Sequence, residues 1–144
     1  MKTWLTIAVL FLVAGCATAP SGASRTVSAT DLRPFAGQWT GTIMSRDMAS
    51  ALGRVEAPAR LTLGDDGRFT LTSSGGTVVT GVARQTAKGI VGDGRVTAGD
   101  PMTVGREVSF VLKPRGTDAL FGRGQAFFLG LRIDDEILLK RQSG

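Results

Sequence analysis

Apolar residues recur at every second position along most of the chain after residue 35. Within each of the clearest runs the apolar residues share one parity: Leu61 and Leu63; Phe69 and Leu71; Val108, Phe110 and Leu112; Ile137 and Leu139. Polar residues such as Arg60, Thr62 and Thr70 mostly take the other parity. A period of two is typical of β-strands that bury one face, and no long helical repeat interrupts it.

These runs predict about eight strands separated by turns. The predicted segments are 38–45, 56–63, 68–72, 77–84, 89–96, 106–113, 119–124, 126–133 and 136–141, and residues 119–133 form either one long bent strand or two. Between the second and third segments, Gly64-Asp65-Asp66-Gly67 predicts a tight hairpin turn. Short strands at regular spacing indicate an all-β fold, either a sandwich or an up-and-down barrel.

Glycines inside the predicted strands point to a strongly coiled sheet. Gly41, Gly81, Gly92 and Gly130 weaken isolated strands, but they permit the sharp coiling of a small barrel. The stretch 92–94, Gly-Asp-Gly, is predicted to be a bend or bulge rather than a phosphate-binding loop, because no helix follows it.

The first residues carry a second, unrelated pattern. Lys2 precedes an apolar run from Trp4 to Val13 that is too short to anchor stably across a bilayer, so residues 1–15 are predicted to be an export signal. The following Val13-Ala14-Gly15-Cys16 resembles the lipobox of bacterial lipoproteins, in which the cysteine is lipidated and becomes the new N-terminus. That resemblance makes Cys16 the lipidation site, and the alternative is an ordinary secreted protein with one free thiol.

The segment after this signal and the overall charge bear on where the protein lies and what it binds. Residues 16–30 are small, polar and almost uncharged, which predicts a lipidated N-terminus and flexible tether with a reach on the order of 20 Å. The full chain has a formal charge of +5, with 17 Lys and Arg against 12 Asp and Glu. Because the arginines are scattered singly, nucleic acid is not an expected partner, and anionic lipid or envelope polysaccharide fits the charge better.

The start of the remaining domain, residues 31–144, resembles that of lipocalin-like proteins. The resemblance is carried by Gly37-Gln38-Trp39 after a short turn, and by Arg141 near the end of the last predicted strand. In that family the tryptophan closes the bottom of an eight-stranded barrel and the arginine packs across its ring. The resemblance therefore implies a small antiparallel up-and-down barrel of about eight strands, with Gly37, Trp39 and Arg141 as its structural closure.

Residues suited to catalysis or metal binding are scarce. The chain has no His and no Tyr, so its serines lack an obvious base, and the acidic residues lack the spacing of a calcium loop. Asp65-Asp66 and Asp134-Asp135-Glu136 are predicted to lie in turns and to point into solvent, rather than to converge on a substrate. No catalytic residue, metal site or cofactor is predicted, and the protein is expected not to be an enzyme.

A binding role remains, in one of two forms. An eight-stranded barrel can hold one small ligand or be filled by its own side chains. If it is hollow, we expect an apolar lining and a hydrophobic ligand such as a lipid; the candidates are Ile43, Leu61, Phe69, Phe110 and Phe128. If it is solid, the protein is an accessory lipoprotein that binds an envelope protein or glycan. Ala17, which follows the lipidated cysteine, suggests the outer membrane, facing the periplasm, by resemblance to the enterobacterial sorting rule.

Overall fold

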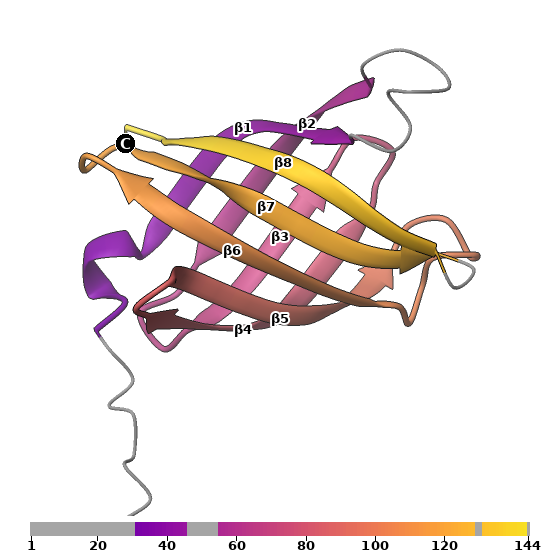
Figure 1. The fold of residues 1–144 in the computed structure, drawn as a ribbon, viewed down its shortest axis with the longest axis horizontal. Helices are drawn as coiled ribbons and strands as arrows, with labels where there is room; N and C mark the ends of the chain where they lie inside the picture. The colour runs from indigo at the N-terminus through magenta and orange to yellow at the C-terminus, as the bar shows by residue number, and fades with distance from the viewer. Residues whose placement is uncertain (1–30, 46–54, 129–130, 144) are drawn as a thin grey trace, which may run out of the picture.

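The computed structural model describes residues 31–45, 55–128 and 131–143, without the side chains of residues 55, 127, 128 and 131–133. It contains one short 3-10 helix and eight strands (Figure 1). The elements are η1 Arg33–Phe35, β1 Gly37–Ser45, β2 Val55–Leu63, β3 Arg68–Ser73, β4 Val78–Thr86, β5 Gly89–Ala98, β6 Glu107–Arg115, β7 Ala119–Phe128 and β8 Leu131–Arg141. The predicted signal, tether and Cys16 lie outside the described residues.

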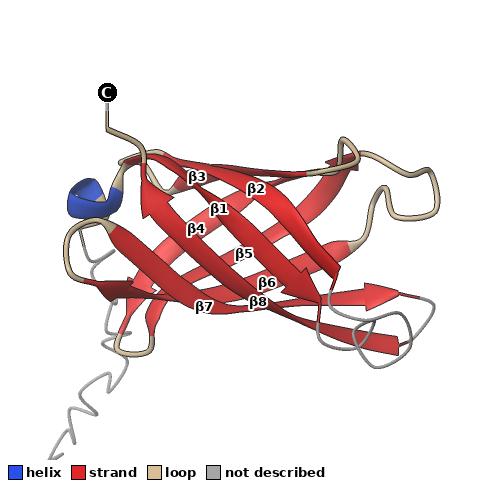
Figure 2. Ribbon diagram, turned by 90° about the horizontal axis from the view of Figure 1, so that it is seen from above, coloured by secondary structure: helices blue, strands red, loops and turns tan. Residues whose placement is uncertain are grey.

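The eight strands form one closed antiparallel barrel. Each strand pairs with the next along the chain, and β1 pairs with β8 to close the sheet. Figure 2 shows the strands of the near and far walls crossing each other. The predicted all-β, up-and-down barrel is thereby confirmed. Closure leaves no unpaired sheet edge among the described strands.

The barrel has two unlike ends. At one end lie η1, the turns 64–67, 87–88 and 116–118, and the end of β8 (Figure 1); we call this the plugged end. Six large side chains with less than 2% relative exposure fill its interior: Trp39, Leu61, Ile90, Leu112, Leu120 and Leu139. The other end, where β1 stops and β8 begins, is called the open end.

Glycines on the inner wall make room for two aromatic rings between these ends. A Cβ at Gly92 would lie 2.2 Å from the Phe110 ring, and a Cβ at Gly81 or Gly94 would lie 2.8 Å from the Phe69 ring. The two rings meet edge to face, 4.9 Å apart. The predicted bend or bulge at 92–94 is wrong, because these residues continue the β4–β5 ladder in regular register, and the irregularity falls at Val78 and Val79.

The last two strands also differ from the prediction. The segment 126–133 is not one strand, since β7 ends at Phe128 and β8 begins at Leu131. Asp134, Asp135 and Glu136 do not form a turn but lie within β8, paired with residues 123–125 of β7. Acidic residues are tolerated in this strand because this part of β8 approaches the open end of the barrel, where the inner face need not be apolar.

Candidate functional site

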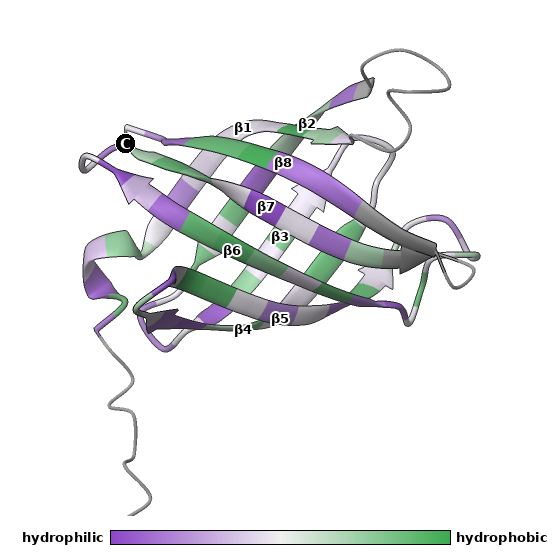
Figure 3. Ribbon diagram, in the orientation of Figure 1, coloured by the Kyte–Doolittle hydropathy of each residue, from purple (hydrophilic) through white to green (hydrophobic). Residues whose placement is uncertain are grey.

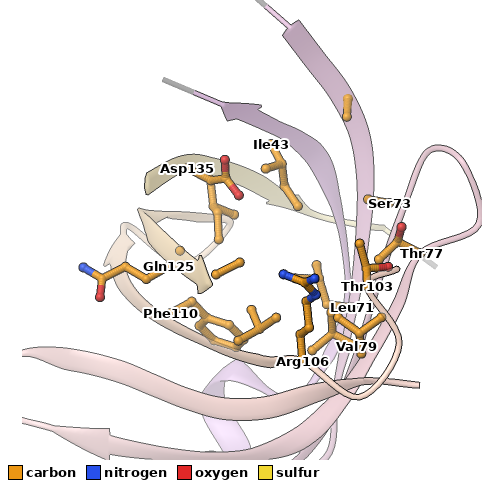
Figure 4. A pocket seen from close by; sticks show the side chains of 16 residues that line it. Ile43, Leu71, Ser73, Thr77, Val79, Thr103, Arg106, Phe110, Gln125 and Asp135 are labelled. Carbon is orange, nitrogen blue, oxygen red and sulfur yellow. The ribbon is translucent and has the colours of Figure 1, made fainter. Parts of the chain in front are cut away.

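A cavity of about 210 Å³ occupies the open end of the barrel. All eight strands contribute to its wall, together with the loop between β5 and β6, and Figure 4 shows the side chains that surround it. The six fully buried side chains that fill the plugged end do not line the cavity.

The deep part of the wall is apolar. Ile43, Leu71, Val79, Phe110 and Ile137 surround it, each from a different strand. Phe110 is 3% exposed and is held by its edge-to-face contact with Phe69 behind it. The floor is therefore well packed, and it offers an occupant a rigid apolar surface.

Small inner residues create the empty space. Ala57 on β2, and Gly124 and Ala126 on β7, occupy wall positions where other strands carry Leu, Val or Phe. At the plugged end the same two strands place Leu61 and Leu120 inside the barrel, so the interior becomes solid there. Side-chain size along β2 and β7 thus determines how deep the cavity reaches.

The rim of the cavity carries polar groups. The Arg106 side chain is held from the β5–β6 loop, where its Nε donates a hydrogen bond to the Met102 carbonyl oxygen at 2.7 Å. Thr103 Oγ1 donates to the Asp100 carbonyl oxygen at 2.8 Å, and Asp135 adds a carboxylate from β8. Gln125 on β7 also borders the cavity, but its amide points away from it in Figure 4. Figure 4 shows Asp135 near Ile43 on one side of the cavity, and Arg106 near Leu71 and Val79 on the other. A molecule with one apolar part and one polar part matches this arrangement.

Two of the five predicted lining residues lie on this wall. Ile43 and Phe110 line the cavity. Leu61 and Phe69 do not: both are buried deeper, Leu61 opposite Trp39 and Phe69 opposite Gly81, so their assignment to the lining is corrected to core. The side chain of Phe128 lies outside the described residues.

The predicted closure residues meet at the plugged end. Arg141 pairs with Trp39 across β1 and β8, and its guanidinium carbon lies 4.5 Å from the centre of the indole ring. Trp39 Nε1 donates to the Phe35 carbonyl oxygen at 2.9 Å. Gly37 has a φ of +131°, a value that favours glycine, where the chain passes from η1 into β1.

Arg141 also fastens two loops over the barrel end. Its Nη1 donates to the Ala36 carbonyl oxygen at 3.2 Å, its Nη2 donates to that of Pro34, and its Nε donates to that of Thr117 at 3.3 Å. One side chain therefore joins η1, the β6–β7 turn and the Trp39 ring, which is the role expected of a structural closure.

Asp31 and Arg33, at the start of the described chain, form an ion pair. Asp31 Oδ1 accepts hydrogen bonds from the backbone nitrogen of Arg33 at 3.1 Å and from its Nε at 2.8 Å. These bonds hold the pKa of Asp31 below its ordinary value and raise the pKa of Arg33. Both groups are fully exposed, so the pair orders the start of η1 without a buried charge.

The described residues form an apolar cavity that also carries polar groups on its wall. Among them, no three His, Cys, Asp or Glu side chains gather in a way that could hold a metal ion. In the same residues, no helix has the length and hydropathy required to cross a bilayer. No family model, curated protein or solved structure matches the chain, so the function has to be inferred from the site itself.

Proposed function

We propose that this chain is a non-enzymatic envelope lipoprotein whose barrel takes up the apolar part of a small amphiphile at its open end. The supporting observation is the cavity itself, with apolar side chains around Phe110 and the polar groups of Arg106 and Asp135 on its wall. An acyl chain or another compact apolar group would enter, and its polar end would stay at the rim.

The volume limits what can enter. Pockets for drug-sized ligands usually span about 300–1,000 Å³, and a cavity of about 210 Å³ is smaller. The proposed occupant is therefore a short acyl segment or part of a larger lipid rather than a wholly enclosed molecule.

The proposed place of action rests on the N-terminal sequence. Its lipobox-like Val13-Ala14-Gly15-Cys16 supports a lipid anchor on Cys16, and Ala17 supports the outer membrane, facing the periplasm. If this is correct, Cys16→Ser removes lipid labelling and releases the chain from the membrane fraction. Membrane attachment that persists in Cys16→Ser would contradict the proposed anchor.

A second candidate function is supported by the solid half of the barrel. Because the plugged end is filled by its own side chains, the protein can also act as an accessory lipoprotein whose outer surface binds an envelope protein or glycan. The two candidates differ in whether the cavity is used.

Native mass spectrometry of residues 17–144 separates these candidates. All described strands and core residues lie between Leu32 and Arg141, so this shorter chain retains the fold. If the barrel takes up an amphiphile, we expect a co-purifying lipid, or uptake of one added fatty acid per protein molecule. Protein that is always ligand-free and takes up no fatty acid would favour the accessory function.

A further inference from the structure

The outer wall formed by β6, β7 and β8 combines exposed cations with apolar side chains. In register across the three strands, Lys113 faces Phe121, and Phe121 faces Leu138. The next row toward the plugged end pairs Arg115 with Ala119, and Ala119 with Lys140; the row on the other side pairs Val111 with Arg123. We call these side chains the basic face: Val111, Lys113, Arg115, Phe121, Arg123, Leu138 and Lys140.

The apolar centre of the basic face is open to solvent. Leu138 is 44% exposed, one of the most exposed large hydrophobic side chains of the described residues. Phe121 beside it is half-buried, and the Arg115 guanidinium carbon lies 4.7 Å from the centre of its ring. Figure 3 shows β6, β7 and β8 side by side, with hydrophobic and hydrophilic segments alternating along them.

The cations of the basic face form no salt bridges among the described residues, in contrast to four arginines elsewhere. Arg33, Arg68, Arg84 and Arg95 each form a salt bridge with a nearby Asp or Glu. Within the described part of the chain, no salt bridge is formed by the four cations of the face, Lys113, Arg115, Arg123 and Lys140. The one carboxylate in these rows, Glu136, lies opposite Arg123. The face thus has an excess of positive charge around an apolar centre.

We propose that the basic face is a docking surface for an anionic phospholipid bilayer. Lys and Arg side chains without salt bridges to described residues match the lipid phosphates, and Leu138 with Phe121 can enter the boundary between headgroups and acyl chains. The chain enters the barrel at Asp31, fifteen residues after Cys16, so the anchor of the proposed function would hold this half of the barrel close to a bilayer. The docking surface itself depends on neither the anchor nor the cavity.

Sedimentation of residues 17–144 with phospholipid vesicles tests the proposal. We expect binding to phosphatidylcholine vesicles that contain phosphatidylglycerol, and little binding to pure phosphatidylcholine. Each cation near an anionic surface contributes about fivefold to the partition, so Lys113→Gln with Lys140→Gln is expected to weaken binding by about 25-fold. Leu138→Gln is expected to weaken it several-fold, because the apolar insertion is lost.

A matched control removes two charges from the opposite wall. Arg60→Gln with Arg68→Gln, on β2 and β3, lowers the net charge by the same amount and is expected to change vesicle binding less than twofold. An equal loss in both double variants would show that only net charge matters and would overturn the proposal. All substituted side chains except Leu138 are charged and exposed, and near-ultraviolet circular dichroism verifies the fold of each variant.

Soluble dextran sulfate distinguishes a bilayer from a free polyanion. If the protein binds dextran sulfate as tightly as vesicles, and Leu138→Gln leaves vesicle binding unchanged, the face is a polyanion site and the bilayer proposal is wrong. Absence of vesicle binding by the unaltered chain would overturn it as well.

Discussion

The two ends of the barrel share one set of strands but differ in the size of their inner side chains. At the plugged end, Trp39, Leu61 and Leu120 are almost fully buried and do not line the cavity. At the open end, the same strands carry Ile43, Ala57 and Ala126, and a cavity of about 210 Å³ remains. The comparison shows that β-barrel topology alone does not determine whether the interior is hollow or filled. The volume of the inward-facing side chains determines this separately at each height along the barrel axis.

Matched leucine truncations give the largest expected effect and test this difference directly. Leu120 is 0% exposed among large neighbours, whereas Leu71 is 6% exposed and borders the existing cavity. Truncation costs more where more contacts are lost, so we expect Leu120→Ala to lower the free energy of unfolding by about 4 kcal/mol and Leu71→Ala by about 2 kcal/mol. Urea unfolding measures both; equal losses would show that the open end is packed as tightly as the plugged end.

The next largest loss of stability is expected from substitution of Arg141, which holds η1 and the β6–β7 turn over the plugged end. Arg141→Ala removes the contact with Trp39 and the hydrogen bonds to Pro34 and Ala36, and is expected to cost about 2 kcal/mol of unfolding free energy. Arg141→Lys keeps the charge but not the planar fork, so it should recover less than half of that loss. Arg60→Ala, on the exposed outer wall, is the control and should stay within about 0.5 kcal/mol of the unaltered protein. Full recovery by lysine would mean that charge, not geometry, seals this end.

A smaller change in stability, with a clear change in binding, is expected when the open end is filled. Ala57→Leu places a larger side chain on the cavity wall, and we expect uptake of a fluorescent fatty acid to fall at least tenfold while stability changes by less than about 1.5 kcal/mol. Ala98→Leu, on an exposed position of β5, makes the same chemical change away from the cavity and should leave uptake intact. Fatty-acid binding that survives Ala57→Leu unchanged would place the ligand elsewhere.

The strands could be predicted from the sequence, but the height of each inner residue along the barrel axis could not. Alternation correctly assigned Leu61, Phe69 and Phe110 to the interior, because parity depends only on the two-residue period of a strand. Parity carries no information about height, which depends on strand register, so Leu61 and Phe69 were placed in the lining although they lie deeper. The small inner residues Ala57 and Ala126 are the sequence feature that indicates a cavity. They can be recognised as such only when the register shows that they lie at the same height in the barrel.

The ends of β7 and β8 were mispredicted for a related reason. The acidic run 134–136 resembles a turn when solvent exposure is inferred from charge alone, yet near the open end a strand can carry acids on either face. By contrast, the contact between Trp39 and Arg141 was predictable, because the lipocalin-like resemblance named both residues and parity placed Arg141 on the inner side.

The smallest expected effect tests whether charge helps to hold the plugged end. The Asp31 pKa is lowered by Arg33, so any stabilisation by this pair is present above about pH 4 and is lost as the pH falls through the lowered folded-state value. Asp31→Asn keeps an oxygen that can accept a hydrogen bond from the Arg33 backbone nitrogen but removes the charge. Urea unfolding should therefore show a small gap between variant and unaltered protein at about pH 6 that closes near about pH 2. A gap as large as that of Arg141→Ala would mean that η1 is held by this exposed ion pair, and that the plugged end owes its closure to charge as much as to packing.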